Sequence, residues 1–162
     1  MNGQAKLVWA IIIVVIVIVA IIAVVLYVNS KSPLIPTAYS IQIVKGTATV
    51  KAGTDVYYKF NIPSGASAAG VLGTFTVQGG SGNGVKVYIF DSTNYNIYYH
   101  NGQDFASIYL SALVPTHTSS INVSALSSGT YYLVLDNKFS TISTKTVNIQ
   151  ATATYWKNLI LT

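Results

Sequence analysis

The strongest constraint on the fold is a run of 22 residues, from Leu7 to Val28, that contains no charge, no glycine and no proline. As a helix with a rise of about 1.5 Å per residue, this run measures about 33 Å, enough to cross a bilayer core. In lipid, an isolated segment can satisfy its backbone polar groups only as a helix. Trp9 and Tyr27 lie near the two ends, where aromatic rings favour the membrane interface. We therefore predict a transmembrane helix over 7–28, with Leu7, Trp9, Tyr27 and Val28 at its boundaries with the bilayer.

The same run argues against a cleaved signal peptide, whose apolar region measures about 7–15 residues and ends at a small-x-small site. Lysines lie on both sides of the run, so the positive-inside rule barely discriminates between orientations. The residues that follow are rich in Thr, Ser, Tyr, Asn and Gly and poor in charge, which is typical of exported domains. We expect residues 1–6 in the cytoplasm and the C-terminal domain outside a cell membrane that the chain crosses once.

Beyond a proline-containing linker over residues 29–37, the hydrophobic period switches to two, the pattern of half-buried strands. Glycine-rich turns separate these segments, and we expect no amphipathic helix after residue 28. This pattern predicts an all-β fold, an antiparallel β-sandwich of jelly-roll or GOLD-like type, over residues 38–155, followed by an apolar tail over 156–162. The expected core-facing rows are Tyr39, Ile41 and Ile43; Val56, Tyr58, Phe60 and Ile62; Val71, Gly73, Phe75 and Val77; Val85, Val87 and Ile89; Tyr131, Leu133 and Leu135; and Val147, Ile149, Ala151, Ala153 and Tyr155.

Two segments resemble GOLD-type β-sandwich domains. The first runs from Gly70 to Asp91 and the second from Gly129 to Gln150, where Asp-Asn, Phe-Ser and Lys-Thr-Val follow one another. The resemblance implies a sandwich with an interaction role. The chain lacks the cysteine pair of the cargo-receptor members, so we transfer no functional residue from that family. The Ile/Val-rich anchor and the cysteine-free, Thr/Tyr/Asn-rich domain also resemble archaeal cell-surface proteins.

No set of residues in the sequence forms a recognisable catalytic constellation. The absence of cysteine excludes thiol chemistry and cysteine-bound metal centres, and His100 and His117 lack a second histidine at metal-binding spacing. Asp91, Asn94 and Asn96 could offer oxygens to calcium, although turn formation by these side chains is the simpler interpretation. We expect a protein that is not an enzyme and uses no cofactor.

The most unusual feature of the exported part is its tyrosine content, 12 in the whole chain. Tyr57, Tyr88, Tyr98 and Tyr132 are candidates for faces opposite the core, where tyrosines serve an interface or cover a sheet. Asn122-Val123-Ser124 is the single N-glycosylation sequon. The formal net charge of +5 comes from scattered lysines without arginine, so we expect no nucleic-acid partner.

These features predict a non-enzymatic, single-pass membrane protein that presents a β-sandwich for interaction. It would be a surface component or an accessory subunit of a membrane complex, with other membrane or surface proteins, or a second copy of itself, as partner. One alternative is a type IV pilin-like filament subunit, although the N-terminal residues fit its processing site imperfectly. Another is a carbohydrate- or calcium-binding surface module.

Overall fold

The computed structural model describes residues 3–29, 34–79, 84–101, 107–110 and 118–160; side chains are described for residues 12–27 of the first helix and up to residue 159 of the last strand. The chain divides into two compact units. One comprises Met1–Ile35 with Leu159–Thr162, and the other comprises Pro36–Asn158.

The first unit contains helix α1, Gly3–Asn29, so the apolar run is helical as expected. All its described side chains, from residue 12 to residue 27, are exposed. Across the described part of the chain, the structure contains no helix with the length and apolar character needed to span a membrane.

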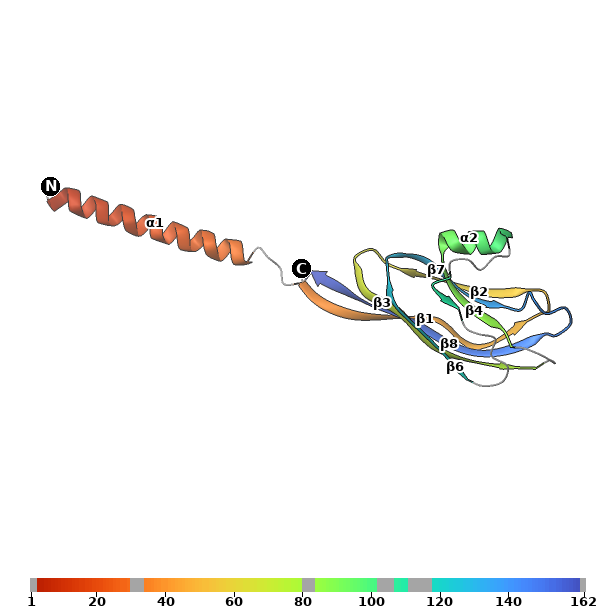
Figure 1. Ribbon diagram of the computed structural model, residues 1–162. Coiled ribbons are helices and arrows are strands. Elements are labelled where there is room, and N and C mark those ends of the chain that lie inside the picture. The colour runs from red at the N-terminus through yellow and green to blue at the C-terminus, as the bar shows by residue number, and fades with distance from the viewer. Residues whose placement is uncertain (1–2, 30–33, 80–83, 102–106, 111–117, 161–162) are drawn as a thin grey trace. The chain divides into compact units, whose positions relative to one another are not determined.

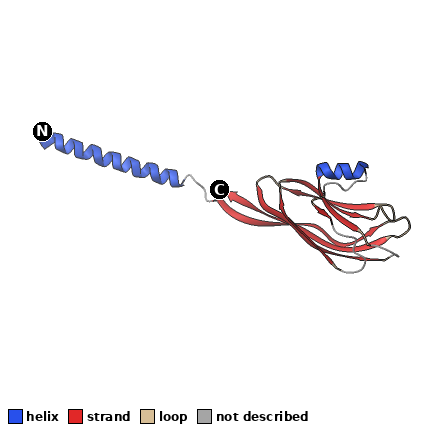
Figure 2. Ribbon diagram, viewed as in Figure 1, coloured by secondary structure: helices blue, strands red, loops and turns tan. Residues whose placement is uncertain are grey.

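The second unit is built mostly from strands, drawn red in Figure 2, arranged as two four-stranded sheets. The strand order is β1-β8-β3-β6 in the first sheet and β2-β7-β4-β5 in the second. The pairs β2–β7, β3–β6, β3–β8, β4–β5 and β4–β7 are antiparallel. The strands are β1 Leu34–Val50, β2 Asp55–Ile62, β3 Ala66–Gln78, β4 Lys86–Asp91, β5 Tyr109–Leu110, β6 Ser119–Leu126, β7 Gly129–Asp136 and β8 Lys145–Ile160.

The main core is formed by the inward rows of both sheets, as the alternation predicted. Its most deeply buried members include Phe75 and Ile149 from the first sheet and Ile89, Leu133 and Leu135 from the second. Because one residue in two points inward, the strands of both sheets supply apolar stripes to this core. The prediction of an antiparallel β-sandwich is thus confirmed.

The prediction of no amphipathic helix after residue 28 is wrong, since helix α2, Ser92–Asn101, buries Tyr95 and Tyr98 on one of its sides. The helix follows β4 directly and lies over the second sheet, on the side away from the first (Figure 1). It packs against β4 and β7. A second, smaller core fills the space beneath it, formed by Tyr88, Phe90, Tyr95, Tyr98 and Val134.

The loop after β7 is fixed by Asn137, which is fully buried. Its side-chain amide donates to the carbonyl oxygens of Val50 and Lys51, both at 3.2 Å, and of Ser143 at 2.8 Å. One amide therefore joins the end of β1 to the loop that leads into β8. At one edge of the sandwich, the Tyr109 hydroxyl of β5 donates to the Ser120 carbonyl of β6 over 2.7 Å and links the two sheets.

Candidate functional site

The candidate site is the outer surface of the second sheet around α2, because many of the tyrosines of this tyrosine-rich chain lie there. The start of α2 is fixed by Asp91, whose Oδ1 accepts the backbone N–H of Asn94 at 2.8 Å. The Asn94 amide donates to the other carboxylate oxygen, also at 2.8 Å. This is the geometry of a helix N-cap, in which a side chain satisfies an unpaired N–H of the first turn.

The three calcium candidates thus lie in one local structure. Asp91 and Asn94 bond to each other, and Asn96 lies exposed on α2. Among the described residues, no three His, Cys, Asp or Glu side chains come together as a metal site would require.

Tyr88 and Tyr98, two of the tyrosines named as candidates for an interface, do not lie on the surface. Tyr88 of β4 points away from the sandwich core and is covered by α2, whereas Tyr98 belongs to α2 and points down onto the sheet; their exposed fractions are only 1% and 2%. Their rings pack with that of Phe90, at centroid distances of 5.1–5.7 Å. They hold α2 on the sheet instead of offering a free contact surface.

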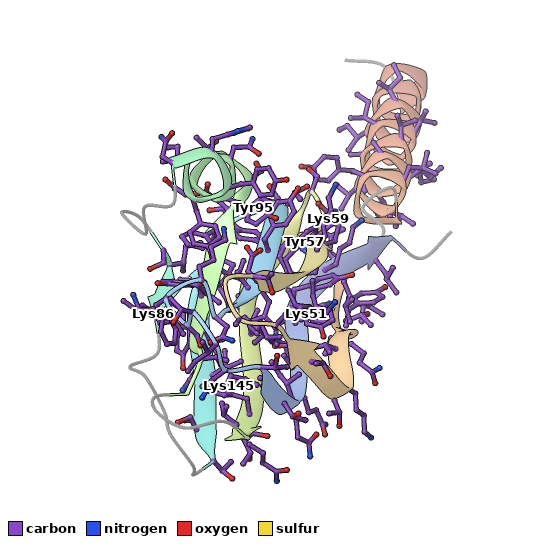
Figure 3. The ribbon with its side chains drawn as sticks, turned by 90° about the vertical axis from the view of Figure 1, so that its right-hand side faces the viewer. Lys51, Tyr57, Lys59, Lys86, Tyr95 and Lys145 are labelled. Carbon is purple, nitrogen blue, oxygen red and sulfur yellow. The ribbon has the colours of Figure 1, made fainter. Side chains whose placement is uncertain are left out.

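A second group of tyrosines around α2, some exposed and some buried, forms what we call the tyrosine patch: Tyr57, Tyr95, Tyr99 and Tyr132. The Tyr95 and Tyr132 rings stack at 3.9 Å with an interplanar angle of 7°. Tyr57 leans on both, with centroids 5.4 and 5.9 Å away, and Tyr99 lies 6.1 Å from Tyr95. Figure 3 shows Tyr57 from β2 facing Tyr95 from α2, with Lys59 beside them.

Exposure within the patch is uneven. Tyr57 and Tyr99 are 52% and 60% exposed, Tyr132 is half-buried and Tyr95 is buried. Burial, together with the Asp55 charge, raises the pKa of the Tyr95 phenol, so that this ring stays neutral. The Lys59 ammonium lies 6.0 Å from the Tyr132 ring centroid, at the outer limit of a cation–π contact. The patch is a rigid aromatic surface with one cation at its border.

A small ionic cluster lies beside the inner tyrosines, formed by Asp55, Asp136 and Lys138. The Lys138 ammonium is 3.3 Å from Asp55 Oδ2 and 4.2 Å from the Tyr98 ring centroid. The backbone N–H of Lys138 donates to Asp136 Oδ1 at 2.7 Å. Burial raises the pKa of the Asp136 carboxyl, an effect that this hydrogen bond and the Lys138 charge oppose.

The Tyr98 hydroxyl is buried beside Asp136 and interacts with its carboxylate, outside ordinary hydrogen-bond geometry. Burial, followed by the Asp136 charge, raises the pKa of this phenol. The cluster holds no nucleophile poised next to a base, and its one lysine is already paired. The cluster has the arrangement of a structural group that lies against Tyr98 of α2.

The remaining predicted residues lie elsewhere. Asn122 is exposed on β6, as a sequon acceptor must be, and His100 is exposed at the end of α2. Tyr27 is exposed on α1, whereas the side chains of Leu7, Trp9 and Val28 lie outside the described residues, as does His117. Residues 156–160, expected as a tail, continue strand β8.

Residues 73–150 match the family model described as a secretion system C-terminal sorting domain. No curated protein matches the chain. Of the predicted resemblances, only a β-sandwich is shown; neither the GOLD family nor an archaeal origin is shown.

Solved structures similar to the chain share little sequence with it. One is the VP2 subviral particle of infectious bursal disease virus, with 9% identity over 75% of this chain and 33% of that one, and a TM-score of 0.46. Another is a Yersinia pseudotuberculosis-derived mitogen, with 9% identity, coverage of 72% and 86%, and a TM-score of 0.39. A third is the C-terminal CBM6 of LamC from Zobellia galactanivorans, with 10% identity, coverage of 74% and 99%, and a TM-score of 0.36. These similarities carry no inference about the site.

Sequence reasoning missed Tyr95, Tyr99 and Lys59 as members of the surface. A signal for the first two was present, since Tyr95, Tyr98 and Tyr99 are spaced three and four residues apart, as on one side of a helix. Lys59 lies two residues after Tyr57 along β2, and residues two apart in a strand share one face.

Proposed function

We propose that the chain is a non-enzymatic surface protein, anchored in a membrane through α1, whose sandwich binds another membrane or surface protein through the tyrosine patch. The observation that carries the binding role is the mutual contact of four tyrosine rings around α2, two of them more than half exposed. Tyrosines are enriched at protein interfaces because they supply a large contact area at a low entropic cost.

The anchor proposal rests on the sequence and side chains of α1. Apolar residues point in every direction around this helix, and the described ones, from Ile12 to Leu26, are exposed. A helix that is apolar on all sides is typical of a protein interior or a lipid bilayer. The match to a secretion system sorting domain supports export of the sandwich.

The test of location uses the full chain in its native cells. Alkaline carbonate washing of membranes should leave the chain in the pellet, and protease added outside intact cells should digest the sandwich. A full-length chain recovered in the soluble fraction of the cell interior would contradict both the anchor and export.

The test of binding uses in-cell cross-linking followed by mass spectrometry. The double variant Tyr57→Ala and Tyr99→Ala should lose the cross-linked partner, because these rings carry the exposed area of the patch. Trp156→Ala is the matched control, since it removes an exposed aromatic side chain from the other sheet. Equal cross-linking of the double variant and the wild type would show that the patch is not the interface.

A further inference from the structure

A second surface feature lies on the opposite side of the sandwich. A shallow groove of 630 Å³, largely open to solvent, runs over β6, β3 and β8 on the outer face of the first sheet. Two cross-strand rows line it, Asn122–Leu72–Thr152 and Ser120–Thr74–Gln150, each aligned by the register of the three strands.

Six of the nine residues that line the groove have polar, uncharged side chains, and none of the nine carries a charge. Beyond the two rows, the lining adds Thr154 and the backbone around Gly73 and Ile121. For the side chains of Asn122, Gln150 and the three threonines, no hydrogen bond to another described residue is found. Leu72 lies among them, 54% exposed, and is the only large apolar side chain on the groove surface.

The combination of uncharged polar side chains with one exposed leucine favours one chemical class of ligand. An anion or a cation would find no opposite charge here, and an apolar ligand would leave the amide and hydroxyl groups without partners, at a cost of about 1–3 kcal/mol each. A neutral ligand with many hydroxyl groups and a small apolar face satisfies both the polar rows and Leu72. Sugar rings have this composition, with hydroxyls at the rim and C–H groups on the faces.

The backbone at one end of the groove is held in an uncommon conformation. β3 and β6 both depart from regular register near Ala69, and Ala68 and Ala125 have φ angles of 48° and 61°. Non-glycine residues rarely adopt this region, and such strain concentrates at functional sites. Gly70 and Gly73 let the neighbouring strands approach closely, because a Cβ there would lie 2.5 Å from the Val123 and Gln150 carbonyl oxygens.

We propose that this groove binds a neutral carbohydrate chain, with Asn122 and Gln150 as hydrogen-bonding residues and Leu72 as the contact for a sugar face. The groove shares no residue with the tyrosine patch, so carbohydrate binding and protein binding can fail independently. The carbohydrate comes from outside the chain.

The inference is tested by calorimetric titration of the full chain with defined oligosaccharides. The chain is produced in a host without N-glycosylation, so that Asn122 is free, and is purified in lauryldimethylamine oxide, a detergent without a sugar head group. The probes are neutral hexasaccharides of the cellulose, laminarin and mannan types, with an alginate hexasaccharide as the anionic comparison.

At least one neutral hexasaccharide should bind, and the alginate hexasaccharide should not. Gln150→Ala and Leu72→Ala should each weaken binding roughly tenfold, the loss expected when one such contact is removed. Asn148→Ala, exposed two residues along β8 and outside the groove lining, should retain the wild-type affinity. Binding of none of the neutral probes, or equal affinity for the wild type and the two groove variants, would overturn the inference.

Discussion

Asp55 and Asp136 lie directly opposite each other across β2 and β7, and Lys138 interacts with both. Lys86 is the register partner of Asp136 on its other side, in β4. Like charges at facing positions repel each other, so this part of the sheet depends on its lysines. Burial adds to the cost, and the pKa of Asp136 is raised from its ordinary value of 3.8.

The raised pKa of Asp136 determines the direction in which the stability of the fold changes with pH. The folded chain holds the Asp136 proton more tightly than the unfolded chain, so folding takes up a proton between the ordinary and the raised pKa. The cost of the buried charge is fully present above the raised pKa and is relieved as the pH falls towards 3.8. We expect Asp136→Asn to increase the free energy of unfolding at pH 7 and to lose this advantage at pH 4. Urea unfolding at the two pH values measures the effect.

Asp55→Asn is the contrasting variant, because it removes the ion-pair partner of Lys138 and leaves Asp136 charged. It should not stabilise the chain at pH 7. A stability difference between wild type and Asp136→Asn that is the same at both pH values would contradict the assignment.

Removal of the Asn137 amide should cost about 3 kcal/mol. Asn137→Ala removes three hydrogen bonds, each worth about 1 kcal/mol. The Lys51 and Ser143 oxygens keep other donors, from Thr54 and Ser140. Asn148→Ala, on the exposed face of β8, should change stability by less than about 0.5 kcal/mol. Chemical unfolding of both variants gives the comparison, and equal losses would show that the Asn137 hydrogen bonds contribute little.

Gly73→Ala should destabilise the sandwich by about 1–3 kcal/mol, as overpacking does. The added Cβ would meet the Gln150 carbonyl oxygen at 2.5 Å and the Ala151 Cα at 3.0 Å, backbone atoms that cannot turn aside. Leu72→Ala, at the exposed neighbouring position, should cost less than this. Thermal melting of the two variants distinguishes them, and an unchanged melting temperature for Gly73→Ala would mean that β8 has room to move.

Loss of the helix cap should loosen α2. Asp91→Ala removes the acceptor for the Asn94 N–H and should cost about 1 kcal/mol, whereas Asp91→Asn, an equally good cap, should cost little. Thermal melting with and without calcium also separates the two interpretations of this motif. Calcium that stabilises the wild type, but not Asp91→Asn, would favour a metal site over a cap.

The sandwich core was predictable because burial on one face of a strand imposes a period of two, as in the row from Val147 to Tyr155. Strand β6 was missed, since its serine-rich sequence carries only Ile121 and Val123 as a short alternating signal. Helix α2 was missed because Tyr and Asn have weak helix propensity, and packing of Tyr95 and Tyr98 on the sheet outweighs it.

The surfaces were predictable only in part. Alternation placed Thr74 and Gln150 on faces opposite the core, but their alignment with Ser120 depends on β3 lying between β6 and β8. Strand order is set by tertiary packing and not by local pattern, so no single segment of the sequence encodes the groove. The burial of Tyr88 also depends on tertiary packing, because this side chain is covered only where α2 packs on the sheet.

Because α2 covers part of the second sheet, the outer faces of the two sheets differ in their chemistry. The outer face of the second sheet presents aromatic rings packed against a helix. The outer face of the first sheet presents amide and hydroxyl groups that project directly from its strands. A ligand suited to one face is poorly suited to the other, so the two proposed sites would not compete for the same ligand.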